Sequence, residues 1–346
     1  MYNKSTMDKF QKYLLLIERK LQENWEKFSN FLPLYLFSAY HMGWVDEKGN
    51  PLTEYKGGKR LRPLLCVLIN QAFNGPLDDA LNLASSLEFL HNFSLVHDDI
   101  QDGDEKRHNR WTVWKLWGIP QAINVGDSLF NLCFQVLTQI SSPILQRTSL
   151  REITNAIQEL IEGQYLDLSF ERRSDVYLKE YMIMIEKKTA RLFATAFFLG
   201  SFSANYKEDL SRKFFEIGKD FGLFFQIADD VLGIWGDPKK TGKPSLGDLW
   251  KKKKTFPIIY LLQEVSEKEK QKLFEIWNRE RLLEQDILYI LEMLDRKRVK
   301  EASINTAERF FEKSYKALEE YDELIDLSLI KELLKNYYNL IFSLQS

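Results

Sequence analysis

Residues 221–237 read FGLFFQIADDVLGIWGD. Apolar side chains recur there every three or four positions, which predicts a buried helix rather than a β-strand. Two adjacent carboxylates, Asp229 and Asp230, interrupt the apolar run near its end. Like charges this close together destabilise a helix unless something neutralises them. The stretch therefore predicts a helical core with a charged site at its edge.

The same periodicity extends through most of the 346 residues. Glycine and proline are sparse, and no alternating apolar runs are joined by Asn-Gly or Asp-Gly, so the evidence for strands is weak. None of the breaks resembles a flexible inter-domain linker. We therefore predict an all-α fold, a single-domain bundle over residues 1–346 with helices packed around a central space. The predicted helices span about 8–29, 31–42, 58–74, 77–99, 119–140, 149–169, 175–203, 207–235, 248–264, 268–278, 283–321 and 327–344.

Composition argues against several classes of function. The 50 acidic and 48 basic residues nearly cancel, so no overall field draws the chain to nucleic acid or to an anionic membrane. The longest apolar run, residues 192–200, is far too short to span a bilayer. Cys66 and Cys133 cannot build a disulfide framework, and each is flanked by apolar residues. We expect a cytoplasmic protein with no nucleic-acid partner and no transmembrane segment.

A second acidic cluster ends another apolar helix. Asp98, Asp99 and Asp102 lie in HDDIQD, and helical spacing places positions 98 and 102 on one face with 99 beside them. Oxygen ligands at this density suit a hard cation, and Mg²⁺ binds a few carboxylates together with phosphate oxygens. A single aspartate pair is also compatible with a solvated helix end. Two pairs, each at the end of a long apolar helix, favour one shared metal site.

The cluster formed by Asp229 and Asp230 lacks one acid. Gly233 stands four residues after Asp229, where a third carboxylate would complete the one-face pattern. The next acid, Asp237, lies two turns further on and beside Pro238. We expect Asp237 to reach the metal only through water.

Three separate basic elements accompany the acids. GGKRLRP at 57–63 places basic side chains after a glycine pair, where a helix N-terminus would favour an anion. EKKTARLFATA carries Lys188 and Thr189, and GDPKKTGKP carries Lys243. Any one of these elements alone is typical of a solvated charge run. Together with two acidic clusters they predict a site for diphosphate groups bridged by Mg²⁺, next to an apolar cavity.

The order of these motifs resembles one family. GGKRLRP, HDDIQD, GQYLDL, KKTA, FQIADD…GDPKKTGKP and KKKT follow one another as in the trans-isoprenyl diphosphate synthases, also called the polyprenyl synthetase family. The resemblance runs from about residue 55 to residue 260. It implies the isoprenoid synthase fold, in which two aspartate motifs face each other across a deep central apolar cavity. It also implies a homodimer and three Mg²⁺ ions that hold an allylic prenyl diphosphate.

The resemblance also assigns roles to residues. The implied magnesium ligands are Asp98, Asp102 and Asp229, which form the predicted catalytic set with Asp99, Asp230 and Lys188. The implied ligands of the allylic diphosphate are Arg107, Lys188, Thr189, Gln226 and Lys243. The implied ligands of the second substrate, isopentenyl diphosphate, are Lys59, Arg62 and His91.

The chain departs from the family after the first aspartate motif. The family reads RRG or RRH and then x-Pro-Thr, whereas residues 107–112 read RHNRWT. Arg107, for the allylic diphosphate, is kept, but His108 replaces the second arginine and Trp111 replaces the proline. A histidine with an ordinary pKa is mostly neutral at pH 7 and cannot form the bidentate clamp of an arginine. We expect Trp111 to add bulk beside the site.

Two enzyme functions follow from this departure. The first, which we take as the main interpretation, ionises a prenyl diphosphate of geranylgeranyl to geranylfarnesyl length and releases a terpene hydrocarbon, as in class IB terpene synthases (diphosphate lyases). The alternative elongates an allylic diphosphate with isopentenyl diphosphate as a prenyltransferase, and the kept Lys59, Arg62 and His91 favour it. A third possibility is an inactive partner that regulates an active synthase.

Aromatic residues near the first motif have less specific interpretations. Phe93 lies five residues before Asp98 and is predicted to form part of the cavity floor and limit chain length, although plain core packing is equally compatible. Trp111, Trp114 and Trp117 recur at helical spacing, and packing explains them better than stabilisation of a carbocation. His97 is expected to be a packing residue, and His41 carries no signal.

Overall fold

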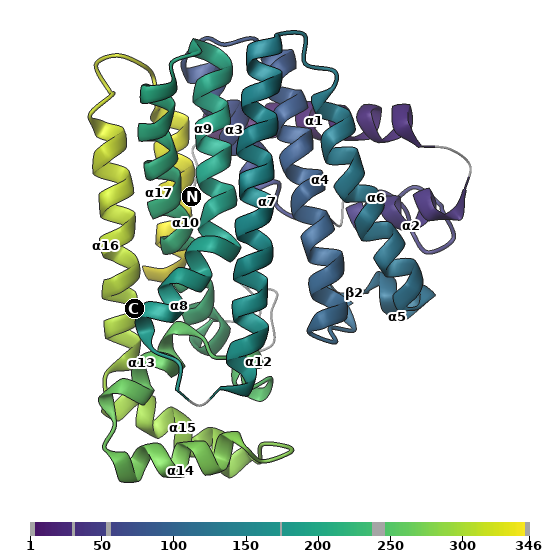
Figure 1. Cartoon of the computed structure of the whole chain (residues 1–346). Coiled ribbons are helices and arrows are strands. Elements are labelled where there is room, and N and C mark those ends of the chain that lie inside the picture. The colour runs from purple at the N-terminus through teal and green to yellow at the C-terminus, as the bar shows by residue number, and fades with distance from the viewer. Residues whose placement is uncertain (1–3, 30–31, 53–56, 174, 237–245, 343–346) are drawn as a thin grey trace. The chain divides into compact units, whose positions relative to one another are not determined.

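The computed structural model describes residues 4–29, 32–52, 57–173, 175–236 and 246–342 (Figure 1). The prediction of an all-α fold is confirmed, because helices make up nearly all of its regular structure. The helices are α1 (Lys4–Phe28), α2 (Pro33–Met42), α3 (Leu61–Ala72), α4 (Leu77–Gln101), α5 (Val113–Trp117), α6 (Ile119–Leu137), α7 (Pro143–Arg172), α8 (Leu178–Ile185), the π-helix η1 (Glu186–Ala190), α9 (Arg191–Asn205), α10 (Glu208–Trp235), α12 (Gly247–Trp250), α13 (Phe256–Glu264), α14 (Glu267–Trp277), α15 (Glu284–Arg296), α16 (Val299–Glu319) and α17 (Ser328–Phe342). One short hairpin, β1 (Lys106–Arg107) and β2 (Arg110–Trp111), was not predicted.

Three predicted helices are divided in the structure. The prediction over 175–203 contains η1, and the prediction over 248–264 is interrupted between α12 and α13, where Lys252 has a positive φ of 55°. The prediction over 283–321 is divided between α15 and α16, because Arg298 is left-handed with a φ of 50°. Side-chain periodicity continues across such breaks, since a single residue with positive φ changes the chain direction without changing the apolar pattern.

The chain divides into two compact units. Residues 2–155 and 196–212 form the N-terminal unit, and residues 156–195 and 213–346 form the C-terminal unit. Each unit has its own core. The single-domain organisation and the central apolar cavity stay predictions.

In the N-terminal unit, α4 packs against α3 and α6 (Figure 1). Most of α4 is buried, including polar residues such as Ser85, Glu88 and Asn92. Gly126 of α6 allows a close approach, because a Cβ there would lie 2.2 Å from Nε2 of His97 on α4. This contact gives His97 the packing role predicted for it. Cys66 and Cys133 are both buried and free.

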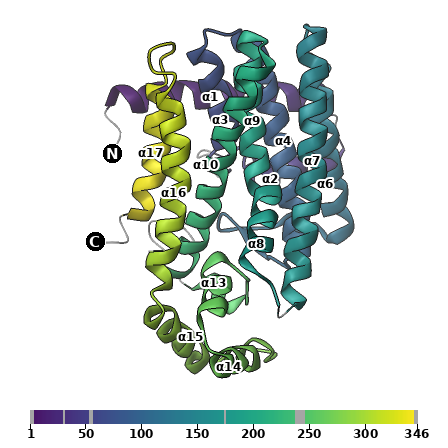
Figure 2. The same cartoon turned by 60° about the vertical axis from the view of Figure 1, so that its left-hand side comes forward.

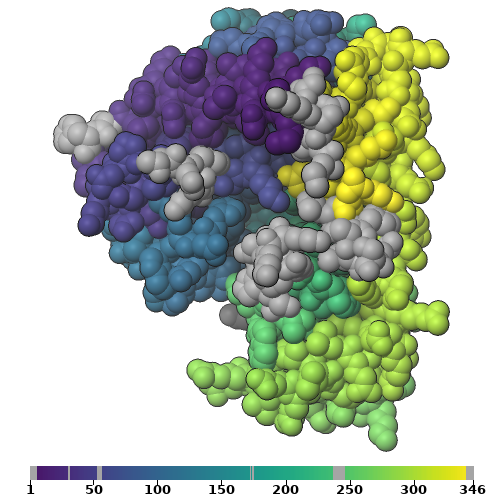
Figure 3. All heavy atoms as spheres, turned by 180° about the vertical axis from the view of Figure 1, so that it is seen from behind, coloured from purple at the N-terminus to yellow at the C-terminus, as the bar shows by residue number. Residues whose placement is uncertain are grey.

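In the C-terminal unit, α16 packs against α13 and α17. Figure 2 shows α14 and α15 below α13, and a second apolar cluster that includes Ile258, Leu273 and Ile290 joins these helices. Helix α14 begins with a capping box in which Ser266 and Glu269 satisfy each other's backbone N–H groups. The space-filling view shows α16 and α17 side by side at the surface (Figure 3).

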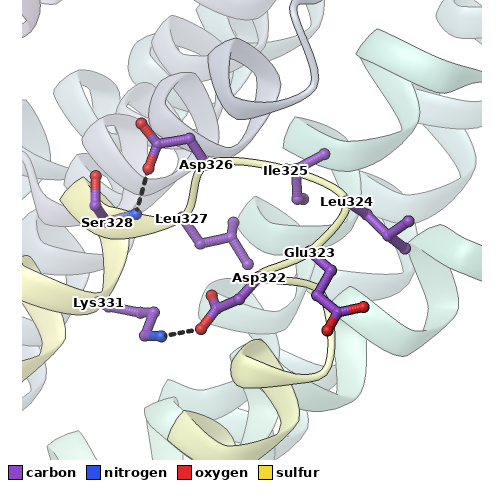
Figure 4. A pocket seen from close by; sticks show the side chains of 8 residues that line it. All are labelled: Asp322, Glu323, Leu324, Ile325, Asp326, Leu327, Ser328 and Lys331. Atoms are coloured by element: carbon purple, nitrogen blue, oxygen red, sulfur yellow. Dashed lines mark hydrogen bonds and ion pairs between the residues drawn. The ribbon is translucent and has the colours of Figure 1, made fainter.

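A pocket of about 520 Å³ lies in the loop between α16 and α17. It is lined by residues 322–328 and Lys331, and Lys331 pairs with Asp322 across it (Figure 4). None of the predicted site residues lines this pocket, so it is not the candidate site. Within the residues described, no helix is both long and apolar enough to cross a bilayer.

Candidate functional site

The first aspartate pair lies in the last turn of α4. The Asp98 side chain is 20% exposed, whereas Asp99 is 2% exposed and faces the protein interior. Nε and Nη2 of Arg107 both lie 2.8 Å from Oδ1 of Asp99. Burial raises the pKa of Asp99 to about 6, and Arg107 opposes this effect. Its second oxygen, Oδ2, is buried and has no hydrogen-bond partner among the described residues.

Arg107 is held in place by the unpredicted hairpin. Lys106 pairs with Trp111 and Arg107 pairs with Arg110 in an antiparallel register. The two turn residues, His108 and Asn109, have φ values of 51° and 61°. Positive φ at both central residues is the feature of a type I′ turn, for which Asn-Gly is the usual sequence signal. Because this turn contains no glycine, the usual sequence signal for it is absent.

Arg110 attaches the hairpin to the end of α2. Its Nη1 donates to the carbonyl of Tyr40 at 2.8 Å and its Nη2 to the carbonyl of Val45 at 2.6 Å. The guanidinium also lies 3.8 Å from the centre of the Tyr40 ring, and the Tyr40 hydroxyl donates to the carbonyl of Trp111. Arg110 is therefore a structural residue and does not replace the arginine missing at position 108.

Trp111 lies on the exposed side of the hairpin, and the expectation that it adds bulk beside the site stays a prediction. Its side chain is 43% exposed, and Nζ of Lys106 lies 4.4 Å from the ring centre. Residues alternate between the faces of a strand, so Lys106 and Trp111 share the face opposite to that of Arg107. Trp117 stacks on Phe37 with ring centres 4.1 Å apart, which is the packing role predicted for the tryptophans.

Basic side chains and neutral histidines gather beside Arg107. Nη1 of Arg62 lies 3.2 Å from Nε2 of His91. Burial, and then the charges of Arg62 and Arg107, place the pKa of His91 well below its usual value. His91 is therefore neutral and accepts a hydrogen bond from Arg62. Partial desolvation and then Arg107 lower the pKa of His108, and Lys59 adds to the effect.

Arg60 and His41 also lie among these basic side chains, although neither was predicted to be a site residue. Arg60 begins α3 in a left-handed conformation and is buried, with its guanidinium bound to Glu18, Glu88 and the carbonyl of Met42. His41 was not predicted, and its buried Nε2 has no partner among the described residues. Burial and the neighbouring cations, Arg107 foremost, lower its pKa to about 3.

The second aspartate pair lies on α10 and is also asymmetric. Asp229 is partly exposed, whereas Asp230 is buried. Asp230 accepts hydrogen bonds from the hydroxyl of Tyr181, from the backbone N–H of Phe256 at 2.8 Å and from Nε2 of Gln226 at 2.9 Å. Burial raises its pKa to about 7. Asp230 thus connects α8, α10 and the N-terminus of α13.

The predicted diphosphate ligands of the C-terminal unit extend this network. The Thr189 hydroxyl donates to Oε1 of Gln226 at 2.7 Å, so both residues are coupled to Asp230. Nζ of Lys188 lies 2.5 Å from Oδ2 of Asp167. Lys243 and Asp237 fall outside the described residues.

A π-helical segment carries Lys188 and Thr189. Such single turns with wider spacing occur often at functional sites. Gly163 of α7 packs against this segment, since a Cβ there would lie 2.4 Å from the backbone nitrogen of Lys188. The sequence motif GQYLDL thus supplies both the glycine that allows the approach and Asp167, which fixes the lysine.

Gly233 also marks a close approach. A Cβ at this position would lie 1.9 Å from Oδ2 of Asp248, which belongs to α12. The carboxylate of Asp248 therefore fills the space beside Gly233. The sequence contains no signal for this, because the contact joins residues that lie 15 positions apart along the chain.

Phe93 is buried and packs on α6. Its ring lies 5.0 Å from Phe130 and 4.9 Å from His97 between centres. These contacts agree with the core-packing alternative predicted for Phe93. Control of chain length by Phe93 stays a prediction.

The acids fit magnesium in one of its usual modes. Among the described residues, no three His, Cys, Asp or Glu side chains converge closely enough to hold a metal ion by themselves. Mg²⁺ commonly uses one or two carboxylates and completes its shell with water and substrate phosphate oxygens. The partly exposed Asp98 beside the unpartnered Oδ2 of Asp99 suits that mode. The approach of the two aspartate motifs to each other stays a prediction.

Comparisons with known proteins agree with these motifs. The polyprenyl synthetase family profile matches residues 46–294. A (2E,6E)-farnesyl diphosphate synthase of Mycobacterium tuberculosis is 43% identical over 222 residues, which are 64% of this chain and 61% of that protein. The chain thus matches less than two thirds of the mycobacterial relative's length. A geranylgeranyl diphosphate synthase of Saccharolobus solfataricus is 39% identical over 67% of this chain and 70% of its own.

Solved structures show the same fold over nearly the whole chain. A polyprenyl synthetase of Streptomyces coelicolor has a TM-score of 0.84 and 31% identity, and the match covers 96% of this chain and 98% of that one. A geranylgeranyl pyrophosphate synthetase of Pyrococcus horikoshii has a TM-score of 0.85 and 30% identity, with coverage of 97% and 98%.

Proposed function

The chain belongs to the polyprenyl synthetase family, and from this premise we propose that it condenses isopentenyl diphosphate with an allylic prenyl diphosphate to form a longer prenyl diphosphate. The relatives of known activity are named farnesyl and geranylgeranyl diphosphate synthases, which favours elongation over the release of a terpene hydrocarbon. We propose products of this length class.

One observation carries the proposal. Arg62 and His91, two of the implied ligands of isopentenyl diphosphate, form a hydrogen-bonded pair within reach of the charge of Arg107, which supports use of this second substrate. The terpene synthase interpretation relied partly on bulk from Trp111, which lies on the exposed face of the hairpin. The exposure of Trp111 weakens the case for terpene release, whereas the missing arginine charge at position 108 still favours it.

The reaction forms one carbon–carbon bond and breaks one carbon–oxygen bond. The double bond of isopentenyl diphosphate attacks the allylic carbon, diphosphate leaves, and a proton is lost to restore a double bond. Asp98, Asp102 and Asp229 would hold magnesium, which when bound supplies positive charge against the departing diphosphate. Ion number, homodimer formation and a cytoplasmic location stay predictions.

The protein's own residues position the two diphosphates. Arg107 is fixed by Asp99, and its charge lies where the allylic diphosphate is proposed to bind. Lys188 is fixed by Asp167 and would serve the same diphosphate from the C-terminal unit. Because these cations are already held in place, little conformational freedom is lost when charge develops on the leaving group.

A substrate panel tests the proposal. The purified protein is incubated with Mg²⁺ and geranyl, farnesyl, geranylgeranyl or geranylfarnesyl diphosphate, with and without isopentenyl diphosphate. We expect longer prenyl diphosphates only when isopentenyl diphosphate is present. Hydrocarbon formed equally well without isopentenyl diphosphate would contradict the proposal and support a terpene synthase. Absence of any product with all four substrates would support the inactive-partner alternative.

A further inference from the structure

Gly233 lies in the last turn of α10. Glycine is less favourable than alanine within a helix. The backbone there is helical, so no positive φ requires a glycine. The space does require it, because Oδ2 of Asp248 lies 1.9 Å from where a Cβ would stand. The glycine thus makes room for a carboxylate from α12.

This carboxylate lies on the same face of α10 as Asp229. Residues four apart on a helix are neighbours on one face, one turn apart. Position 233 follows Asp229 by four, so the side chain of Asp248 occupies the next place along that face.

Asp230 does not supply the carboxylate that this face of α10 lacks. Three donors from Tyr181, Phe256 and Gln226 already bind its oxygens. Asp248 is partly exposed, as is Asp229. Among the described residues, Asp229 and Asp248 are thus partly exposed carboxylates near this end of α10.

We propose that Asp248 replaces, from a second helix, the acid that α10 lacks at position 233, and that it is a positioning residue for magnesium diphosphate bound at Asp229. The inference rests on the proposed function, since it assumes a magnesium-dependent diphosphate site. Mg²⁺ retains several of its waters, and carboxylates that bind those waters affect metal affinity by about 10- to 100-fold. Asp248 supplies such a carboxylate next to Asp229.

A binding experiment tests this role without relying on turnover. Mg²⁺ is titrated calorimetrically into the protein at a saturating concentration of inorganic diphosphate. We expect Asp248→Asn to weaken Mg²⁺ binding by about 10- to 100-fold. The control is Asp295→Asn, the same chemical change at an exposed position of α15, and it should bind Mg²⁺ as the parent does. Unchanged Mg²⁺ affinity in folded Asp248→Asn would overturn the proposal.

Moving the carboxylate from position 248 to position 233 separates an effect on Mg²⁺ binding from an effect on packing. Gly233→Asp alone should lower the melting temperature, because its side chain collides with Asp248. The double variant Gly233→Asp/Asp248→Ala removes the collision and returns a carboxylate to the same face. We expect its Mg²⁺ affinity to return to within about threefold of the parent, which is less than 1 kcal/mol. A folded double variant that binds Mg²⁺ as weakly as Asp248→Asn would overturn the replacement.

The binding test of Asp248 and the elongation test of the proposed function can fail independently. If the protein elongates prenyl diphosphates but Asp248→Asn binds Mg²⁺ as tightly as the parent, only the inference about Asp248 is contradicted. A protein that binds Mg²⁺ and diphosphate through Asp248, but does not consume isopentenyl diphosphate, contradicts only the proposed function.

Discussion

Asp99 and Asp230 are buried carboxylates whose pKa values are raised by burial to about 6 and about 7. Their neighbours, Asp98 and Asp229, are more accessible to solvent. Each pair therefore contains one carboxylate that can face a metal and one that fixes its surroundings, Arg107 in the first pair and the start of α13 in the second. Sequence alone predicted both pairs. It could not assign the two roles, because adjacent aspartates are chemically identical and only burial distinguishes them.

Position 108 gives the clearest prediction for a single residue. His108→Arg should lower the KM for isopentenyl diphosphate about tenfold or more, because a charge-assisted hydrogen bond contributes about 1.5–3 kcal/mol. The KM for the allylic diphosphate should not change. Steady-state kinetics with each substrate varied in turn measures both values. An equal effect on both KM values would mean that position 108 does not belong to the second diphosphate site.

His41 predicts a dependence of stability on pH. Its folded pKa of about 3 lies below the usual value near 6.5, so the unfolded chain binds the proton more tightly. Its contribution to stability is therefore complete above pH 6.5 and is lost as the pH falls below that value. Between pH 7 and pH 5 this loss amounts to about 2 kcal/mol. His41→Gln should reduce the fall in unfolding free energy, measured by urea denaturation, by that amount. Parallel pH profiles for parent and variant would contradict this assignment.

Two short irregular elements orient the basic side chains. The hairpin of residues 106–111 directs Arg107 to Asp99 while Arg110 attaches it to α2. The π-helix η1 places Lys188 beside Asp167. Helical periodicity predicted the long helices around both elements but neither element itself. A two-residue turn without glycine and a single widened helical turn leave the apolar pattern almost unchanged.

Gly163 tests the role of the π-helical segment. Gly163→Ala should lower the free energy of unfolding by about 1–3 kcal/mol, because the new Cβ collides with the backbone of Lys188, which cannot rotate away. It should also lower kcat, since Lys188 moves from its place beside Asp167. Gly58→Ala is the control for stability, as a Cβ there meets nothing within 4 Å. Full stability and full activity of Gly163→Ala would show that the close approach is not required.

At the scale of the whole molecule, the order of the motifs predicted the family and the fold class. Both are confirmed, by the family match over residues 46–294 and by structural likeness over nearly the whole chain. The preference for terpene release is not supported, because the similar proteins are named farnesyl and geranylgeranyl diphosphate synthases. Side-chain direction in an unrecognised hairpin could not be read from the sequence. The contact of Asp248 with Gly233 was equally inaccessible, since it joins separate helices.

Product length would depend on the predicted apolar cavity as a whole, and Phe93 is the residue predicted to limit it. Phe93→Ala removes a ring that packs on Phe130 and leaves space in the core of the N-terminal unit. We expect longer products, and a loss of stability of about 3–5 kcal/mol if the space does not collapse. Chromatography of the dephosphorylated products and thermal denaturation measure the two effects. An unchanged product profile in a folded variant would assign Phe93 to packing alone.

Incorporation of radiolabelled isopentenyl diphosphate tests the central claim most directly. The protein is incubated with Mg²⁺, farnesyl diphosphate and the labelled substrate, and the label is followed into products that retain the diphosphate group. Elongation predicts label in a longer prenyl diphosphate, with a yield that falls in Arg62→Ala because the pair with His91 is lost. Label that remains entirely in isopentenyl diphosphate, while farnesyl diphosphate is converted to hydrocarbon, would contradict the account.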